Sequence, residues 1–432
     1  MPGLIGICSF GEGSEKWNVL RFTYYAMLAL QNRGQEAFSI AWVDKATGSL
    51  RKVEASGNVE ELLPLIDGSS GHVAIGMTSP LVSDHIVEVD GDVRVAVAMD
   101  GKTLDHRDRR EACKAIGEEL SSGSPLHESM LRVATKYRVG YSFLVLTEKG
   151  EVGCGRSAVG LKPLTIGSIG FDLGCVASES SALDVIGATY SSIVGAGEII
   201  TMTPLTLKRD RVIGATEEPC TFEFVYLARH DSVVFQEDVY RVREEVGKCL
   251  ARGDEVDCDV VIGVPETSYP IALSYGATRR RAVKLGFVRS GDHIRSALKG
   301  SQLERLIGLQ LKLNPVPSVV DGKNVVLIDD SIVRGNTLKN VISLLRRKGA
   351  VGVHVRIGSP QIVKTCPYGT EIPPRDELIA GNLRLEDIKK VIGCDSIEFL
   401  RLEDLERLIS KDNVRPCTGC FGGRYAGDVK VD

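Results

Sequence analysis

A strand, a polar loop and a helix that follow one another near residue 330 constrain the fold more than any other part of this sequence. Residues 325–328 are apolar β-formers, residues 329–337 are mostly polar, and residues 338–348 repeat apolar side chains at helical spacing. A loop that ends at a helix N-terminus presents free backbone N–H groups and the positive end of the helix dipole, and both favour a bound phosphate. The segment therefore predicts a phosphate-binding strand–loop–helix unit.

The side chains of this loop fit an anionic sugar phosphate. Gly335 lets the backbone approach an anion, and the hydroxyls of Ser331 and Thr337 can donate to it. Asp329 and Asp330 cannot hold a phosphate themselves, but they suit ribose hydroxyls or Mg²⁺ carried by a pyrophosphate. For the acid pair taken alone, an exposed Asp-Asp turn that caps a helix is the competing interpretation.

The chain has 432 residues, enough for two ordinary domains with separate cores. Up to about residue 203 the pattern is sheet-rich, with helical periodicity at residues 20–32 and 107–120. After about residue 218 strands and helices alternate, which favours a parallel sheet with crossover helices. The predicted strands are residues 38–43, 93–99, 141–146, 260–264, 325–328 and 351–357, and predicted helices of the second half begin at Pro270 and at residue 338.

Composition argues against several classes of function. The net charge of −4 gives no reason to expect nucleic acid as a partner. No apolar run approaches the roughly 20 residues of a membrane span, and the first residues lack the basic region of a signal peptide. We therefore expect a cytoplasmic protein without a nucleic-acid or membrane partner. Its 11 cysteines are an odd count for such a chain and favour free thiols or metal ligands over disulfides.

The string Asp-Asp-Ser-Ile-Val-Arg-Gly at residues 329–335, with Thr337 two places on, resembles the signature of type I phosphoribosyltransferases in the version found in amidophosphoribosyltransferases. Further similar strings follow in family order at residues 28–37, 176–180, 195–199, 222–229, 263–267 and 312–315. The resemblance implies an α/β and α+β chain: an N-terminal nucleophile hydrolase-like αββα sandwich, placed at residues 1–215, followed by a type I phosphoribosyltransferase parallel-sheet domain at residues 216–432. It also implies an activity of purine synthesis, in which phosphoribosyl pyrophosphate and ammonia drawn from glutamine give 5-phosphoribosylamine.

The resemblance also assigns roles by position. Asp329, Asp330 and Thr267 would face Mg²⁺ and the pyrophosphate. The 5-phosphate would be held by Ser331, Ile332, Val333, Arg334, Gly335, Asn336 and Thr337. Residues 289–312 match a loop that the family closes over the substrate, and closure excludes water from a reactive centre. This loop keeps a catalytic Arg295 and substrate-binding Arg305 and Lys312, but the family's Arg-x-Phe reads Arg295-Ser296-Ala297.

The half that resembles a glutaminase departs from the family at its catalytic positions. Family members place a cysteine nucleophile directly before the first strand, where this chain has Pro2, so the thiol and its α-amine base are missing. Cys8 lies inside that strand and is interpreted as a packed core residue. The arginine for the substrate carboxylate falls near Ser79, and the Asn-Gly of the oxyanion hole reads Asp100-Gly101. No clear match for the amine-binding string lies around residues 121–124. We expect a retained scaffold without glutaminase activity.

The pair Cys417 and Cys420 is a C-x₂-C motif, which by itself is compatible with zinc, redox or iron–sulfur roles. With Cys220, which precedes an expected strand at residues 222–226, and Cys366, it resembles the ligand set of family members that carry a [4Fe–4S] cluster. The resemblance therefore implies Mg²⁺ and a [4Fe–4S] cluster as cofactors. Small buried apolar roles are expected for Cys113, Cys154, Cys175, Cys249, Cys258 and Cys394.

Three functions compete on these grounds. The leading hypothesis is a phosphoribosyltransferase that uses ammonia, supplied as free ammonium or by a glutaminase-competent paralogue in a homo- or hetero-oligomer. The alternative is a non-catalytic subunit that senses phosphoribosyl pyrophosphate or nucleotides, which the altered loop and Glu266 favour. A purine-type repressor would need a DNA-binding module, and both halves of the sequence are already accounted for.

Overall fold

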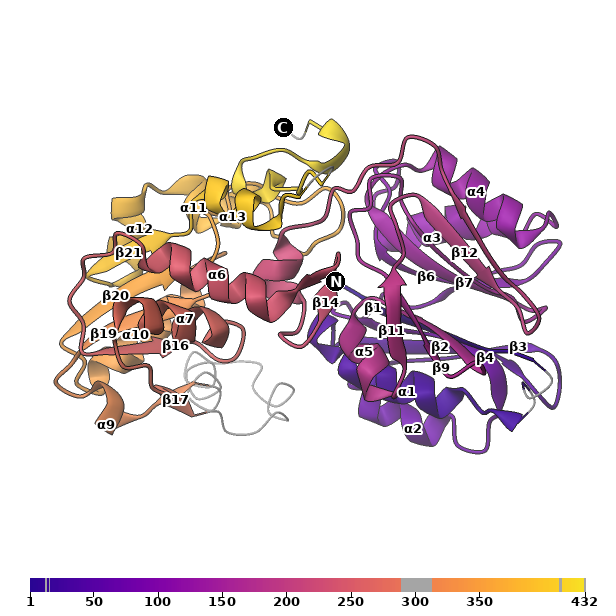
Figure 1. Ribbon diagram of the computed structural model, residues 1–432, viewed down its shortest axis with the longest axis horizontal. Coiled ribbons are helices and arrows are strands. Elements are labelled where there is room, and N and C mark those ends of the chain that lie inside the picture. Colours follow the sequence, from indigo (N-terminus) through magenta and orange to yellow (C-terminus); the bar gives the residue numbers. More distant parts are fainter. Residues whose placement is uncertain (12–13, 15, 289–312, 412–413, 431–432) are drawn as a thin grey trace.

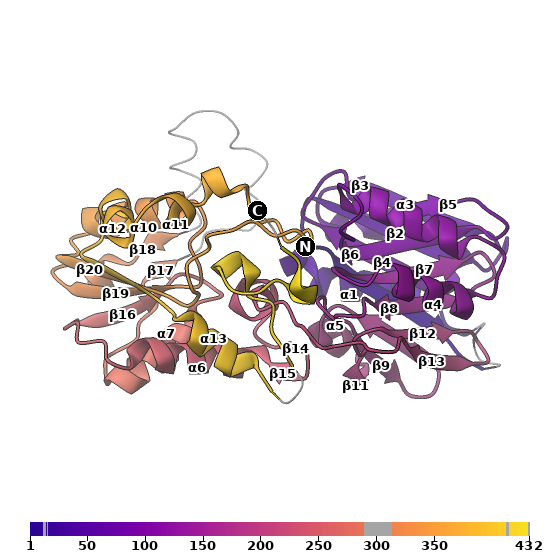
Figure 2. The ribbon, with the colours of Figure 1, turned by 90° about the horizontal axis from the view of Figure 1, so that it is seen from above.

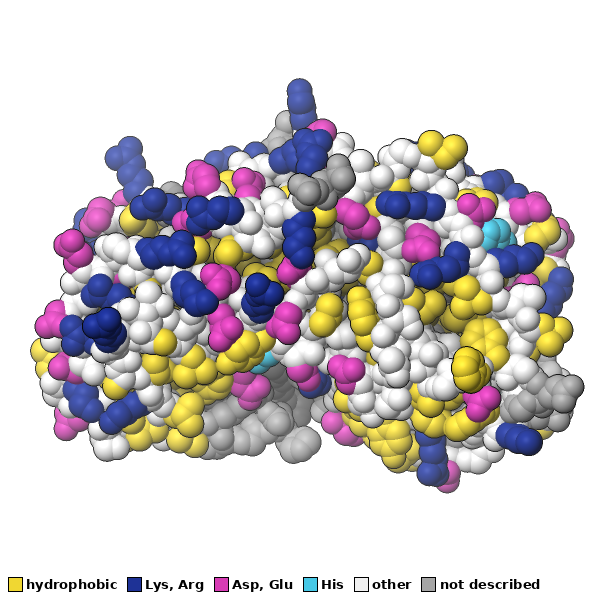
Figure 3. Space-filling view, viewed as in Figure 1, with side chains coloured by type: hydrophobic (Ala, Val, Ile, Leu, Met, Phe, Trp, Pro, Cys, Tyr) yellow, Lys and Arg dark blue, Asp and Glu magenta, His cyan; other side chains and the backbone are white. Residues whose placement is uncertain are grey.

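The computed structural model describes residues 1–432 except 12–13, 15, 289–312, 412–413 and 431–432. Figure 1 shows two lobes joined side by side, and the N-terminus lies at their junction. The view from above shows the C-terminal segment returning to the same junction (Figure 2). Basic and acidic side chains are interspersed on the face that Figure 3 displays. In the described part of the chain, no helix is both long enough and apolar enough to span a bilayer.

The first lobe is built from two stacked antiparallel sheets, which bury apolar side chains between them. The seven-stranded sheet has the order β11 (Thr189–Ile193), β9 (Thr165–Ile169), β10 (Leu173–Ala177), β1 (Gly3–Ser9), β4 (Gly71–Ser79), β2 (Ala37–Asp44) and β3 (Leu50–Ser56). The six-stranded sheet has the order β13 (Leu207–Arg211), β12 (Glu198–Met202), β8 (Val152–Arg156), β7 (Tyr141–Thr147), β6 (Val95–Gly101) and β5 (Val87–Val89).

Helices cover both outer faces of this sandwich. The first sheet packs against α1 (Leu20–Ala29), α2 (Leu62–Leu65) and α5 (Ser180–Val185), with short 3₁₀ turns at Gln31–Arg33 and Val59–Glu61. The second sheet packs against α3 (Arg109–Leu120) and α4 (Leu126–Lys136). The side chain of Asp108 caps α3 by accepting from the N–H of Glu111. The four layers confirm the predicted αββα sandwich.

The second lobe holds a four-stranded parallel sheet with the order β16 (Val260–Gly263), β19 (Asn324–Asp329), β20 (Gly352–Ile357) and β21 (Ser396–Phe399). One face packs against α6 (Val239–Ala251), α7 (Tyr269–Arg279) and α13 (Leu402–Ile409). The other packs against α9 (Pro317–Val320), α10 (Asn336–Arg347), α11 (Ile379–Asn382) and α12 (Leu385–Ile392). The central residues of β19 are all apolar because helices cover both faces of the sheet. The predicted parallel-sheet domain is confirmed.

Smaller elements complete this lobe. They are the strand pairs β14 (Val233–Val234) with β15 (Glu237–Asp238) and β17 (Phe287–Val288) with β18 (Asn314–Pro315), and 3₁₀ turns at Arg375–Glu377, Gly419–Phe421 and Ala426–Asp428. The strand expected at residues 222–226 is wrong, because Glu223–Leu227 forms a π-helical turn. In that turn Phe224 and Val225 are both buried in one core while Glu223 reaches Arg33 of the other lobe, which an alternating strand would not allow. The boundary between residues 215 and 216 stays a prediction.

Candidate functional site

The predicted phosphate loop lies between β19 and α10. Strand β19 ends at Asp329 and α10 begins at Asn336, two residues earlier than its periodicity indicated. Gly335 has a φ of 78°, a left-handed conformation that favours glycine, and it stands at the N-cap of α10. No side chain of the described residues caps this helix, so its first N–H groups are available to an anion.

The loop is anchored from the side of α11. The N–H of Ile379 donates to the carbonyl of Val333 at 2.9 Å, and the guanidinium of Arg334 donates to Glu377 at 2.6 Å. Ile332 is 3% exposed and packs in the core below α10. Among the predicted phosphate-binding residues, Ile332 and Val333 can therefore contribute only backbone groups, because their side chains pack against hydrophobic cores.

The two acids lie together at the end of β19, where Asp330 is buried and Asp329 is partly buried. The Asp330 carboxylate accepts from the Ser331 hydroxyl at 2.8 Å and also from the Thr267 hydroxyl. Burial raises the pKa of Asp329 well above its usual value, and the neighbouring Asp330 charge raises it further. Burial also raises the pKa of Asp330, although hydrogen bonds from Thr267 and Ser331 oppose this shift. Two carboxylates in such a place need a cation between them to stay ionised together, which is the role predicted for Mg²⁺.

The structure brings Thr267, Asp329, Asp330 and the 331–337 loop together, as the resemblance implied. The remaining predicted residues of this site, Arg295, Arg305 and Lys312, lie outside the described residues.

A buried ion cluster lies at the positions where the resemblance placed a glutamine site. Pro2 precedes β1, and its carbonyl accepts from Arg33 Nε at 3.0 Å. The guanidinium of Arg33 also binds Asp100 at 3.0 Å, Glu179 at 3.0 Å and Glu223 at 2.9 Å, and all four side chains are fully buried. Burial by itself would lower the pKa of Arg33, but the carboxylates of Glu223, Asp100 and Glu179 raise it well above its usual value. The Asp100 carboxylate therefore bonds an internal cation of its own lobe, and the contact between Arg33 and Glu223 crosses the lobe junction.

A second buried pair occupies the position expected for the substrate carboxylate. The Ser79 hydroxyl donates to Asp84 at 3.2 Å, and Asp84 forms an ion pair with Arg109. Arg109 in turn donates to the carbonyl of Gly101 at 3.3 Å and to that of Gly369, in the second lobe, at 3.3 Å. Arg33 and Arg109 are therefore both paired with carboxylates within the protein.

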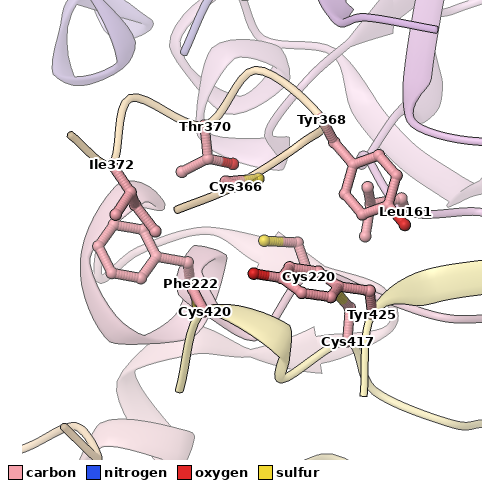
Figure 4. Close-up of a pocket in the computed structure, with 10 residues that line it drawn as sticks. All are labelled: Leu161, Cys220, Phe222, Cys366, Tyr368, Thr370, Ile372, Cys417, Cys420 and Tyr425. Carbon is pink, nitrogen blue, oxygen red and sulfur yellow. The ribbon is translucent and has the colours of Figure 1, made fainter. Parts of the chain in front are cut away.

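The four predicted cluster ligands line one small pocket at the lobe junction (Figure 4). The cavity is otherwise lined by Leu161, Phe222, Tyr368, Thr370, Ile372 and Tyr425. The backbone fixes its rim without any ligand: Cys417 N–H donates to Pro219 at 2.8 Å, and Cys420 accepts from Val363 at 2.9 Å. Sequence positions 220, 366, 417 and 420 thus meet in one place.

The four thiols share one buried environment. Burial raises the pKa of Cys420 well above its usual value, and the other three cysteines raise it further. Among the described residues no group of three or more His, Cys, Asp or Glu side chains is arranged to hold a metal ion. The thiols are therefore near neighbours around one pocket.

Lys162 lies beside this cavity and is fully buried. Its ammonium donates to Thr370, a cavity residue, at 3.0 Å and contacts the Met1 sulfur at 3.2 Å, and neither partner is charged. Burial lowers the pKa of Lys162, but Asp100, Cys220, Cys366 and Glu223 raise it more, so the charged form is favoured. A buried cation at the wall of the cavity would compensate an anionic cluster within it.

The remaining cysteines follow the prediction in part. Cys8, Cys113, Cys154, Cys175, Cys258 and Cys394 are buried and free, as expected, whereas Cys249 is only half-buried. Sequence reasoning assigned no role to Arg33, Lys162 or Arg243, which are all buried basic residues. Nothing in the local sequence marks them, because their partners lie in distant segments.

Comparison with known proteins agrees with this geometry. The phosphoribosyl transferase domain family matches residues 245–363. The amidophosphoribosyltransferase of Bacillus subtilis is 32% identical, over 100% of this chain and 95% of the relative. That of Synechocystis is 32% identical, over 96% and 90%. The structure of glutamine phosphoribosylpyrophosphate amidotransferase from B. subtilis complexed with ADP and GMP superposes with a TM-score of 0.87 at 31% identity, covering 98% of this chain and 97% of that one.

The chain is more than 30% identical to these amidophosphoribosyltransferases over nearly its full length, and it shares its fold with the B. subtilis structure. This chain belongs to the amidophosphoribosyltransferase family, the phosphoribosyltransferases of purine biosynthesis.

Proposed function

We propose that this chain forms 5-phosphoribosylamine from phosphoribosyl pyrophosphate with ammonia that its own first lobe does not produce. The observation that carries the proposal is the Arg33–Asp100 ion pair, fully buried beside Pro2 in the place of a glutamine site, while the phosphate loop and its acid pair are complete. Ammonia would come from free ammonium or from a glutaminase-competent paralogue in a mixed oligomer.

In the phosphoribosyl site the N–H groups of residues 331–337 would hold the 5-phosphate at the start of α10. Asp329, Asp330 and Thr267 would hold Mg²⁺, which neutralises the leaving pyrophosphate. The ammonia nitrogen forms a bond to ribose C1 as the bond from C1 to the pyrophosphate oxygen breaks. Pyrophosphate takes the electron pair, and the surplus proton on nitrogen goes to solvent. Arg295, Arg305 and Lys312 are proposed to close over the donor.

The first lobe is proposed to be inactive towards glutamine for two physical reasons. Amide hydrolysis of this kind needs a thiol directly before β1, and Pro2 has none. An oxyanion hole needs donors, whereas the Asp100 carboxylate is an acceptor that would oppose a developing negative charge.

The first prediction separates nitrogen sources. With Mg²⁺ and phosphoribosyl pyrophosphate, we expect pyrophosphate release when ammonium is added and none above background when glutamine is added alone. The same protein should give no glutamate and no labelled N-terminal residue with a glutamine-analogue alkylator. The B. subtilis relative is the positive control for glutamine use.

Glutamate formation by the purified chain would contradict the inactive first lobe. Binding of phosphoribosyl pyrophosphate without pyrophosphate release under ammonium would contradict catalysis and would leave the alternative, a sensing subunit of an intact paralogue. Absence of binding would contradict both.

We propose further that Cys220, Cys366, Cys417 and Cys420 hold a [4Fe–4S] cluster with a structural role. The support is the pocket that the four cysteines share and the buried ammonium of Lys162, which donates to Thr370 in its lining. The cluster would tie the C-terminal segment to the lobe junction, since its ligands come from three segments distant in sequence.

The second prediction concerns metal content. Anaerobically prepared protein should contain about four iron and four sulfide per chain, as expected of a cubane on four thiolates. The pair Cys417→Ser with Cys420→Ser should lose nearly all of both, because two ligands on one rim are removed. The matched control, Cys249→Ser with Cys394→Ser, removes two thiols outside the cavity and should keep full iron content. Stoichiometric zinc in place of iron would refute the assignment.

A further inference from the structure

The loop that carries Thr267 is bonded through its backbone to His230, a residue to which no role has been assigned. The His230 ring contacts the carbonyl of Glu266 through Nε2 at 2.9 Å and Arg243 Nη1 through Nδ1 at 2.8 Å. Glu266 directly precedes Thr267, whose hydroxyl donates to Asp330. One imidazole therefore connects the pyrophosphate side of the site to the body of the second lobe.

The two contacts fix the state of the ring. A carbonyl oxygen only accepts and a guanidinium only donates, so Nε2 carries the hydrogen and Nδ1 is the acceptor. Burial and the charge of Arg243 lower the pKa of His230, which favours this neutral form. Arg243 is 1% exposed and is itself held by the carbonyls of Phe224 at 2.8 Å and Ala228 at 2.9 Å. The imidazole ring is thus bonded to the buried Arg243 through Nδ1 and to the loop of Glu266 and Thr267 through Nε2.

The segment that bears His230 is also tied to the first lobe. Glu179 accepts from the N–H of Arg229 at 2.9 Å and from the hydroxyl of Ser232 at 2.6 Å. The same carboxylate pairs with Arg33 in the buried ion cluster at 3.0 Å. Hydrogen bonds and the backbone of residues 229–232 therefore connect the buried ion cluster to the carbonyl of Glu266.

We propose that His230 is a positioning residue of the phosphoribosyl site: it fixes the loop that presents Thr267 beside Asp330 and couples that loop to the first lobe. The inference rests on the proposed function, since it concerns the binding of the same pyrophosphate. The first lobe would then have a structural role that needs no glutamine chemistry. Its buried ion cluster would fix residues 229–232, and His230 in that segment would fix the loop that carries Thr267.

The test compares His230→Phe with His230→Gln. Phenylalanine fills the space but can neither donate to Glu266 nor accept from Arg243, whereas a glutamine amide offers one donor and one acceptor. With Mg²⁺, we expect the Phe variant to bind phosphoribosyl pyrophosphate about tenfold more weakly in calorimetry, which corresponds to about 1.4 kcal/mol for the lost hydrogen bonds. The KM for phosphoribosyl pyrophosphate should rise with it while the KM for ammonium stays unchanged. The Gln variant should recover most of the loss.

His354→Phe is the matched control, because this histidine lies in β20 and bonds Ser396 at 2.9 Å. Its affinity for phosphoribosyl pyrophosphate should stay at the original value. A readout without substrate is amide hydrogen exchange of residues 264–268, expected to be faster in His230→Phe and restored in His230→Gln.

Unchanged exchange of residues 264–268 in His230→Phe would overturn the positioning role, whether or not the substrate binds. A Gln variant as impaired as the Phe variant would also overturn it, since the hydrogen bonds would then not be the cause. If the original protein binds no phosphoribosyl pyrophosphate, the proposed function fails, while the exchange measurement still decides the role of His230.

Discussion

Arg33→Met is expected to lower the free energy of unfolding by about 3–5 kcal/mol, the cost of breaking a buried ion pair by removing one partner. The guanidinium binds Asp100, Glu179 and Glu223, and none of these carboxylates has any side-chain exposure. Methionine would fill much of the volume but would leave three buried carboxylates without their shared cation. The expected readout is a lower urea midpoint of the transition that includes the sandwich.

Two controls make this result interpretable. Arg407→Met removes an arginine that is 63% exposed and paired with Asp404 on α13, so a loss of no more than about 1 kcal/mol is expected. Adding Asp100→Asn to Arg33→Met removes one uncompensated charge, so the double variant should lose less stability than the two single variants do in sum. Full additivity would contradict a direct coupling of Arg33 and Asp100. An unchanged midpoint in Arg33→Met would contradict the importance of the whole cluster.

Asp330→Ala is expected to lower catalysis with ammonium by about 2–4 kcal/mol in transition-state stabilisation, because positioning and charge neutralisation fail together. The carboxylate accepts from Thr267 and Ser331 and is 6% exposed, so its loss disturbs both neighbouring loops and the proposed Mg²⁺ position. The measurement is kcat/KM for phosphoribosyl pyrophosphate, with calorimetry across a Mg²⁺ titration.

Asp330→Asn separates geometry from charge in this experiment. The asparagine oxygen can accept from one of the two hydroxyls and its NH₂ group can donate to the other, but the side chain carries no charge. The variant should therefore keep much of the loop geometry and lose the Mg²⁺ dependence. Asp376→Ala, on an exposed carboxylate of the same lobe, is the matched control and should change neither quantity. A fully Mg²⁺-dependent Asp330→Asn variant would contradict the metal role of this residue.

The fold followed from the sequence where local pattern and chemistry agree. Strand β19, the polar loop and α10 were predicted within two residues, because an apolar run buried on both faces, a left-handed glycine and an amphipathic helix each leave a local signal. The prediction failed at residues 222–226, where apolar β-formers were taken for a strand. Two tertiary contacts favour a π-helical turn over a strand here: Glu223 pairs with Arg33, and the neighbours of Glu223 are buried.

By itself the sequence determined which chemical groups are present: the phosphate loop and its acids, four matching cysteines, and Pro2 in place of a nucleophile. Only the tertiary structure decided how they meet. It brought the cysteines from three distant segments around one pocket, placed Lys162 beside it through a hydrogen bond to Thr370, and paired Asp100 with Arg33. The same holds for His230, whose role depends on Arg243 and Glu266. A buried charge is stable only beside partners that desolvate with it, and those partners are chosen by chain packing and not by neighbouring residues in the sequence.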